Sequence, residues 1–227
     1  HYTSDNVSLF PALINTVWMT VLALVIAVPL GIFAAIFLVE YAGKGNKFIE
    51  VIRLTTETLS GIPSIIYGLF GMLFFVTALK WGYSMMAGAA TLAIMVLPVI
   101  MRTTEEALLC VPDSFREGSF GLGAGKLRTI FKIVLPSAIP GILSGIILAI
   151  GRIVGETAAL IYTSGTVANL AGFFDSGRTL AIHMYSLSRE GMHTNEAYAT
   201  AVVLLIVVLI INGVSSLIAK KFEAPKQ

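Results

Sequence analysis

The sequence predicts an all-α transmembrane protein, on three observations of composition. Hydrophobic residues make up 56% of the 227 residues, charged residues only 12%, and the mean hydropathy is +0.88. A soluble domain has about 25% charged residues, so this chain cannot cover a water-facing surface with charge. The composition also excludes a disordered chain and a soluble enzyme core, and the net charge of +2 excludes a nucleic-acid module. A lone Cys110 rules out an internal disulfide framework.

Stretches without Asp, Glu, Lys or Arg locate the helices that would cross a bilayer. Such a helix needs about 20 consecutive, mainly apolar residues. We therefore expect residues 1–227 to form a single transmembrane domain with five spans, at approximately 14–38, 60–79, 83–101, 138–162 and 197–218. The fourth span is unusual because it contains Arg152 and Glu156.

Basic residues are distributed unevenly between the segments that connect these spans. Three segments that alternate along the chain contain 11 of the 15 Lys and Arg residues: Lys44, Lys47, Arg53, Arg102, Arg116, Lys126, Arg128, Lys132, Lys220, Lys221 and Lys226. Loops rich in Lys and Arg stay in the cytoplasm. We therefore expect the N-terminus of this chain outside the cell and its C-terminus in the cytoplasm.

The longest polar insertion on the predicted cytoplasmic side spans residues 102–136. It favours two short amphipathic helices, Asp113–Phe120 and Lys126–Leu135, separated by glycines that permit a sharp turn. Such a protrusion suits a groove on a partner protein, and a solvated connecting loop is the alternative. The glycines do not form a phosphate-binding loop, which requires Gly in place of Phe120 and Ser or Thr in place of Leu127.

The spacing within this insertion resembles the EAA loop of ABC importer permeases. The family pattern is Glu-Ala-Ala, three residues, Gly, nine residues and Ile-x-Leu-Pro. Its positions are taken here by Glu117, Gly118, Ser119, Gly123, Ile133, Leu135 and Pro136. The resemblance implies the type I permease fold of an ABC importer. In that family the loop is a coupling loop, which sits in a cleft of the cytoplasmic ATPase subunit and transmits its closure to the spans.

Arg152 and Glu156 are four residues apart in the expected fourth span, so both would project from one helix face. Ionisable groups near mid-bilayer cost about 2.5–3.5 kcal/mol each on insertion scales and usually face a pathway or the bundle interior. One interpretation is an ion pair that joins two helices. The other is a pathway in which Arg152 neutralises an anion, and phosphate suits it because a guanidinium can bind phosphate oxygens through two parallel hydrogen bonds.

Small residues recur at helical spacing in the same span and predict close packing between helices: Gly141, Gly145, Gly151 and Gly155. His183 and His193 lie in the predicted outer loop without ligand-like companions. We expect both to be surface histidines and expect no metal site.

The sequence around Arg152 resembles permeases of the phosphate-specific ABC importer. Gly151–Ala158 is similar to their Arg-x-x-Gly-Glu-Thr segment, and this resemblance places Arg152, Glu156 and Thr157 in the substrate pathway. Other similar segments are Pro29–Gly31, Glu40–Ala42, Ile62–Gly68 and Arg102–Glu105, the last resembling most closely the PstA-type permease. Family members have six spans, so we expect the first span to be missing from this chain.

The resemblance implies the permease subunit of an ATP-driven importer that moves inorganic phosphate across the plasma (inner) membrane of a bacterium or archaeon. The expected partners are a second permease subunit, two cytoplasmic ATPase subunits and an extracytoplasmic phosphate-binding protein. ATP and Mg²⁺ would bind to the ATPase, so this chain is expected to bind no cofactor and not to be an enzyme. The alternatives are a permease for another oxyanion (sulfate, molybdate or phosphonate) and a secondary transporter that needs no ATPase.

Overall fold

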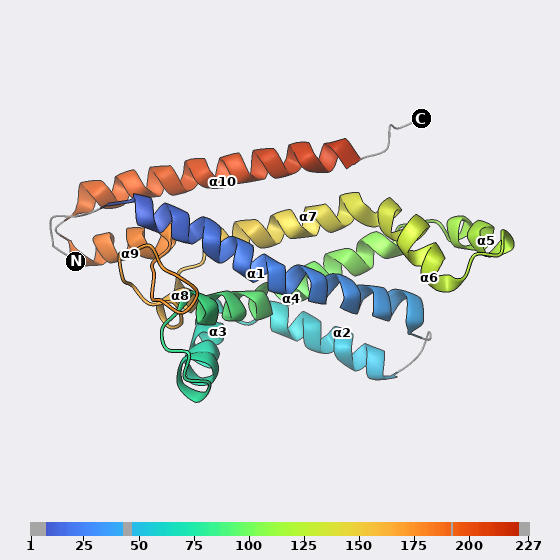
Figure 1. Ribbon diagram of the computed structural model, residues 1–227, viewed down its shortest axis with the longest axis horizontal. Coiled ribbons are helices and arrows are strands. Elements are labelled where there is room, and N and C mark those ends of the chain that lie inside the picture. Colours follow the sequence, from blue (N-terminus) through green and yellow to red (C-terminus); the bar gives the residue numbers. More distant parts are fainter. Residues whose placement is uncertain (1–7, 43–46, 192, 223–227) are drawn as a thin grey trace.

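The computed structural model describes residues 8–42, 47–191 and 193–222, which form an elongated helical bundle (Figure 1). The long helices α1, α4, α7 and α10 run along the bundle, the short α5 and α6 lie at one end, and α9 lies at the other. The elements are α1 (Phe10–Ile36), η1 (Phe37–Tyr41), α2 (Lys47–Ser60), α3 (Ser64–Gly71), η2 (Met72–Ala78), α4 (Met85–Leu109), α5 (Asp113–Gly121), α6 (Lys126–Thr129), η3 (Ile130–Val134), α7 (Leu135–Val154), α8 (Ala158–Ile161), α9 (Leu180–Glu190) and α10 (Thr194–Phe222). We call the two ends of the bundle the α5 end and the α9 end.

The first helix is continuous from Phe10 to Tyr41, because α1 passes directly into the π-helical turn η1. Pro11 stands at its start, where a missing N–H breaks no helical hydrogen bond. The helix packs against α4, and its buried side chains include a stripe at helical spacing: Met19, Ala23, Ala27 and Ala35. A Cβ on Gly31 would lie 2.7 Å from Ile100 Cγ2, so the two helices approach closely there.

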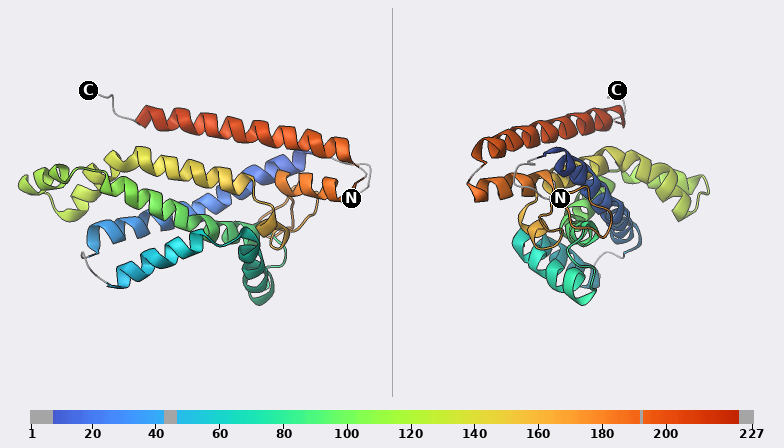
Figure 2. Two further views of the ribbon diagram at one scale, coloured as in Figure 1. Left: turned by 180° about the vertical axis from the view of Figure 1, so that it is seen from behind. Right: turned by 60° about the vertical axis from the view of Figure 1, so that its left-hand side comes forward.

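The predicted span 60–79 is not one straight helix. The α2 and α3–η2 helices are separated by residues 61–63 and differ in direction by 101° (Figure 2). Pro63 explains the break, because it has no N–H to donate and disfavours helical geometry in the preceding residue. The Tyr67 hydroxyl donates to the Leu59 carbonyl at 2.7 Å and so satisfies an acceptor near the end of α2. The charges of α2 hid this helix from a search for apolar runs.

The polar insertion is shorter than the predicted range 102–136. The α4 helix continues past residue 101 to Leu109, and α6, η3 and α7 form one candidate span, Lys126–Val154. Charged residues in the last turns of α4 stay helical. Arg102 pairs with Glu106 at 3.1 Å, an i, i+4 contact that stabilises a helix.

The fourth predicted span, 138–162, also differs from the structure. The α7 helix ends at Val154, with Gly155 as its C-terminal cap residue. After this break the Glu156 carboxylate accepts a hydrogen bond from the backbone N–H of Ala159, at 3.0 Å, and so holds the start of α8. The apolar run continues through the break, which is why the sequence did not reveal it.

The α7 helix crosses α4 at two glycines. A Cβ on Gly141 would lie 2.6 Å from the Cβ of Ala107, and a Cβ on Gly145 would overlap the Thr103 hydroxyl. Small residues allow helix backbones to approach this closely in lipid. The approach fixes α7 against α4.

The last long helix, α10, lies beside α7 and α9. It exposes many of its apolar side chains, among them Val202, Leu205, Ile206, Leu209 and Ile210. Among the described residues, four helices are long and apolar enough to cross a membrane, or five if the bent pair α2–α3 forms one span. The all-α transmembrane fold predicted from the sequence is therefore confirmed.

The crossing of α4 and α7 should tolerate no side chain at Gly145. Gly145→Ala is expected to destabilise the folded subunit by about 1–3 kcal/mol, because the new Cβ overpacks against Thr103. The measurement is the midpoint of thermal unfolding in detergent. Gly151→Ala is the matched control in the same helix, because a Cβ at that position meets no atom within 4 Å. Equal midpoints for the two variants would contradict the close approach.

Candidate functional site

The residues that resemble the EAA loop lie on α5, on the turn after it and on the helix that leads into α7. Glu117 and Gly118 lie on α5, where Gly118 is exposed, and Leu122 at its end is 90% exposed. Ser119 is buried, and its hydroxyl lies 2.8 Å from that of Thr129, so it joins α5 to α6. The loop thus presents one face to the surroundings and packs the other against the bundle.

Gly123 makes the turn between α5 and α6. Its φ of +81° lies in the left-handed region, which side chains with a Cβ adopt only at a cost. The Gly123 N–H donates to the Phe120 carbonyl at 2.9 Å, and the Ala124 N–H donates to the Ser119 carbonyl at 3.1 Å. A Cβ at this position would meet no atom within 4 Å. The glycine is therefore required by the backbone itself and not by its neighbours.

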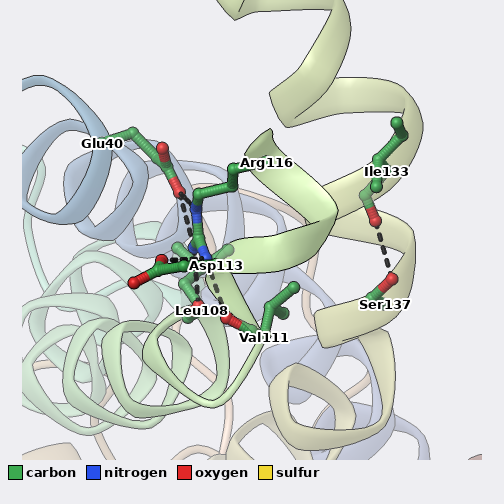
Figure 3. A network of polar contacts seen from close by, with 7 residues as sticks. All are labelled: Glu40, Leu108, Val111, Asp113, Arg116, Ile133 and Ser137. Atoms are coloured by element: carbon green, nitrogen blue, oxygen red, sulfur yellow. Dashed lines mark hydrogen bonds and ion pairs between the residues drawn. The ribbon is translucent and has the colours of Figure 1, made fainter. Parts of the chain in front are cut away.

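The last three motif residues lie where η3 passes into α7. Ile133 and Leu135 are half-buried, and Pro136 is exposed near the start of α7. The Ile133 carbonyl accepts a hydrogen bond from the Ser137 hydroxyl at 2.8 Å (Figure 3). Val134, which separates two of the motif residues, is fully buried. These residues therefore join the loop to a span without a flexible connection.

Arg116 fixes α5 to the rest of the bundle, a role that its sequence context did not predict (Figure 3). Its guanidinium donates to Glu40 Oε1 at 2.9 and 3.1 Å, to Asp113 Oδ1 at 3.2 Å, and to the carbonyls of Leu108 and Val111 at 2.9 and 2.8 Å. The exposed fractions of the Arg116 and Glu40 side chains are 15% and 9%. The sequence indicated only one partner of this ion pair. Glu40 belongs to a segment that resembles the family, whereas Arg116 was noted only as a basic residue of the polar insertion.

Arg152 and Glu156 do not share a helix face, which corrects the expected i, i+4 pair. Arg152 lies in the last turn of α7, and Glu156 lies beyond the end of that helix. No ion pair joins the two within the described ranges. The Glu156 carboxylate instead caps α8 and is 9% exposed. An ion pair between these residues therefore does not explain why Arg152 is present.

Arg152 lines a cavity of about 580 Å³ between α4, α7 and α10. Its other lining residues are Val99, Ser144, Ile147, Leu148, Gly151 and Asn212. The Arg152 side chain is half-buried. Thr157 lines a different cavity, of about 380 Å³, beside Tyr185 and Tyr198. The structure thus separates Thr157 from the cavity of Arg152.

Gly151 and Gly155 make no close helix contact, unlike Gly141 and Gly145. A Cβ on Gly151 would meet no atom within 4 Å, and one on Gly155 would meet only the Gly151 carbonyl, at 3.7 Å. Their expected packing role therefore finds no support within the described part of this chain. Gly151 borders the Arg152 cavity, and Gly155 ends α7.

A second hollow, of about 500 Å³, adjoins the Arg152 cavity and shares Val99 and Leu148 with it. Its lining includes basic and acidic side chains from α2 and α4: Arg53, Glu57, Arg102, Glu105 and Glu106. Arg53 pairs with Glu105, and Arg102 pairs with Glu106 at 3.1 Å and lies 3.8 Å from Glu57. The two adjoining hollows form a groove along α4, with one charged side chain, Arg152, in one part and five in the part toward the α5 end.

His183 is not a surface residue, contrary to expectation, since only 1% of it is exposed. It lies on α9, and its backbone N–H donates to the Thr179 carbonyl at 2.8 Å. Burial, and then the nearby charge of Arg178, lower the pKa of His183 to about 4. The side chain is therefore neutral at pH 7. Among the residues with described positions, no three His, Cys, Asp or Glu side chains are placed to hold a metal ion.

Residues 27–224 match the model of a family described as binding-protein-dependent transport system inner membrane component. The chain is 37% identical to the probable ABC transporter permease protein YqgI of Bacillus subtilis, over 93% of this chain and 79% of the relative. It is 38% identical to the phosphate transport system permease protein PstA 1 of Mycobacterium tuberculosis, over 92% and 69%. It is 39% identical to PstA of Yersinia pestis, over 88% and 68%.

Solved structures of ABC transporters share the fold. The inward-facing MetNI methionine ABC transporter superposes with a TM-score of 0.74 at 21% identity, over 95% of this chain and 94% of that chain. A bacterial ABC transporter involved in the import of alginate superposes with a TM-score of 0.73 at 15% identity, over 95% and 80%. At these identities the likeness concerns the fold alone.

The positive φ of Gly123 predicts a specific sensitivity of the α5–α6 turn. Gly123→Val should strain this turn by about 1–3 kcal/mol, because a β-branched side chain resists a left-handed backbone. The measurement is the rate of trypsin cleavage after Lys126 and Arg128 in the purified subunit, which should rise. Gly125→Val is the matched control, since Gly125 has a φ of −73° and equally open surroundings. Equal cleavage rates in both variants would show that the turn does not depend on the left-handed residue.

Proposed function

We propose that this chain, which belongs to the family of binding-protein-dependent transport system inner membrane components, is the permease subunit of an ATP-driven importer of inorganic phosphate. The observation that carries the proposal is the half-buried Arg152, the one charged side chain among the described residues that line the cavity between α4, α7 and α10. Relatives at 38–39% identity are phosphate transport system permeases. The subunit itself would catalyse no reaction, and ATP hydrolysis would occur on a separate ATPase.

The α5 loop is the surface proposed to dock the ATPase. Gly118 and Leu122 are both exposed at the α5 end of the bundle. On the other side of α5, Arg116 binds Glu40 and Ser119 contacts Thr129. A rigid protruding helix of this kind suits a groove on a partner. The proposed assembly contains two ATPase subunits, a second permease subunit and an extracytoplasmic phosphate-binding protein. The ATPase subunits would also bind ATP and Mg²⁺.

Arg152 is proposed to neutralise phosphate as it passes along α4. No carboxylate pairs with its guanidinium in the described ranges, so its donors are available to the cavity. A planar guanidinium binds phosphate oxygens through two parallel hydrogen bonds. Glu156 would contribute by holding the break between α7 and α8, and Thr157 would line the outer part of the pathway.

The proposed orientation follows from the basic residues of the α5 end. We place α5 in the cytoplasm and α9 outside, so that the chain starts outside and ends inside. A cysteine at Ser114 should then resist an impermeant maleimide in intact cells, whereas a cysteine at Phe174, which is 62% exposed, should react. Cys110 is exposed and must first be replaced by Ser. The opposite labelling pattern would overturn this topology.

The role of Arg152 can be tested by phosphate uptake into proteoliposomes that contain the complete transporter. Arg152→Lys should reduce uptake at least about tenfold, because an ammonium keeps the charge but loses the two-pronged geometry. Arg152→Leu should assemble but not transport, because the guanidinium forms no ion pair within the described residues whose loss would destabilise the subunit. Near-normal uptake by this variant would remove Arg152 from the pathway.

The same proteoliposomes test the substrate. Excess unlabelled phosphate should suppress uptake of labelled phosphate, whereas sulfate, molybdate or phosphonate at the same concentration should have little effect. Preferential competition by one of these anions would identify that anion as the substrate. Uptake without the ATPase subunits would instead indicate a secondary transporter.

A further inference from the structure

The first helix makes polar contacts with functional segments at both of its ends. At the α5 end, Glu40 accepts two hydrogen bonds from Arg116 of α5. The next residue, Tyr41, carries the Lys126 ammonium of α6 over its ring, 4.7 Å from the ring centre. The end of this helix is therefore held by both short helices of the proposed ATPase-docking loop.

At the α9 end, the same helix holds the segment that connects α8 and α9. Asn15 donates to the carbonyls of Asn169 and Arg178, at 2.8 and 3.2 Å, and accepts from the Ala171 N–H at 3.2 Å. The Thr16 hydroxyl accepts from the N–H of Leu180, the first residue of α9, at 2.9 Å. Asn15 and Thr16 are 1% and 2% exposed. This end of the helix is therefore held by buried hydrogen bonds.

We propose that the helix Phe10–Tyr41 is a connecting rod that transmits ATP-driven movement of the α5–α6 loop to the segment 165–179 at the opposite end. This inference rests on the proposed function, because it takes α5 as the ATPase-docking loop. The helix is unbroken over 32 residues, which at 1.5 Å per residue is about 48 Å. A single helix of this length reaches from one end of the bundle to the other (Figures 1 and 2).

The contacts at the two ends are suited to transmission rather than to packing alone. Hydrogen bonds are more directional than apolar contacts, and those between Glu40 and Arg116 join two charged groups, which makes them stronger. The Glu40, Arg116, Asn15 and Thr16 side chains are largely shielded from water. Along its length the helix packs against α4 through small side chains. Displacement of Arg116 therefore pulls on Glu40 at one end and shifts the backbone that Asn15 holds at the other.

The test measures the outer segment while the ATPase is cycled, in the complete transporter reconstituted in nanodiscs. Leu170 is 58% exposed and adjoins both Asn169 and Ala171, so Leu170→Cys in a Cys110→Ser background reports on this segment. The rate of maleimide labelling is measured without nucleotide and with ATP plus vanadate. Transmission through the rod should change this rate by about fivefold, at the lower end of allosteric coupling.

Two variants interrupt the rod at opposite ends. Glu40→Gln removes the charge that binds Arg116, and Asn15→Leu removes the hydrogen bonds to the outer segment. Each should reduce the ratio of the two labelling rates to near one, and the double variant should go no further, because the contacts act in series. Glu196→Gln is the matched control, because it removes the same charge from a half-exposed side chain of α10 that takes no part in the contacts described at either end of the rod. Asn15→Ala replaces Asn15→Leu if that variant fails to assemble, because it also removes the hydrogen bonds to residues 169, 171 and 178.

The outcomes separate this inference from the proposed function. An unchanged ratio in either Glu40→Gln or Asn15→Leu, or a ratio of one in the unmodified complex, would overturn the rod. If ATP changes the labelling rate of Leu170→Cys as expected but the complex takes up no phosphate, the rod is supported and the proposed substrate is refuted.

Discussion

The close approach of α1 and α7 to α4 is the constraint on which the rest of the structure depends. In lipid, helices gain no hydrophobic advantage from meeting one another, so close packing between backbones is one of the main interactions that hold them together. Gly31 permits this approach on the α1 side of α4, and Gly141 and Gly145 permit it on the α7 side. With α4 fixed between its neighbours, the groove that contains Arg152 and the base of the α5 loop are both fixed in place.

Each of two helix breaks in the bundle is stabilised by a side chain from nearby in the sequence. The Tyr67 hydroxyl bonds across the α2–α3 break, and the Glu156 carboxylate caps the start of α8. An unsatisfied backbone group in hydrocarbon costs several kcal/mol, so a helix break inside a bilayer is stabilised by partners of this kind. The two broken segments also pack together, because α3 and α8 are in contact and a Cβ on Gly68 would lie 2.8 Å from the Ala159 Cα.

The sequence predicted the class of the fold and the location of the α5 loop, but not the end of α7 at Val154. An apolar run shows how much chain can enter a bilayer and contains no information on its direction. A proline in a span favours a kink, but the run did not indicate that the bend at Pro63 would be as large as 101°. Charges in α2 and in the last turns of α4 give these helical segments the hydropathy of a loop. The role of Arg116 was not predictable from its neighbours, because its main partner, Glu40, is distant in sequence.

Arg116 and Arg152 lie in different environments within one bundle. All three guanidinium nitrogens of Arg116 donate to oxygen atoms of this chain, so its donors hold segments of the subunit together. Arg152 has no carboxylate partner in the described ranges and borders an open cavity. A half-buried charge without a carboxylate partner in its own subunit gains little from the contacts around it. The proposed passage of phosphate would give Arg152 a role that no ion pair within the described residues provides.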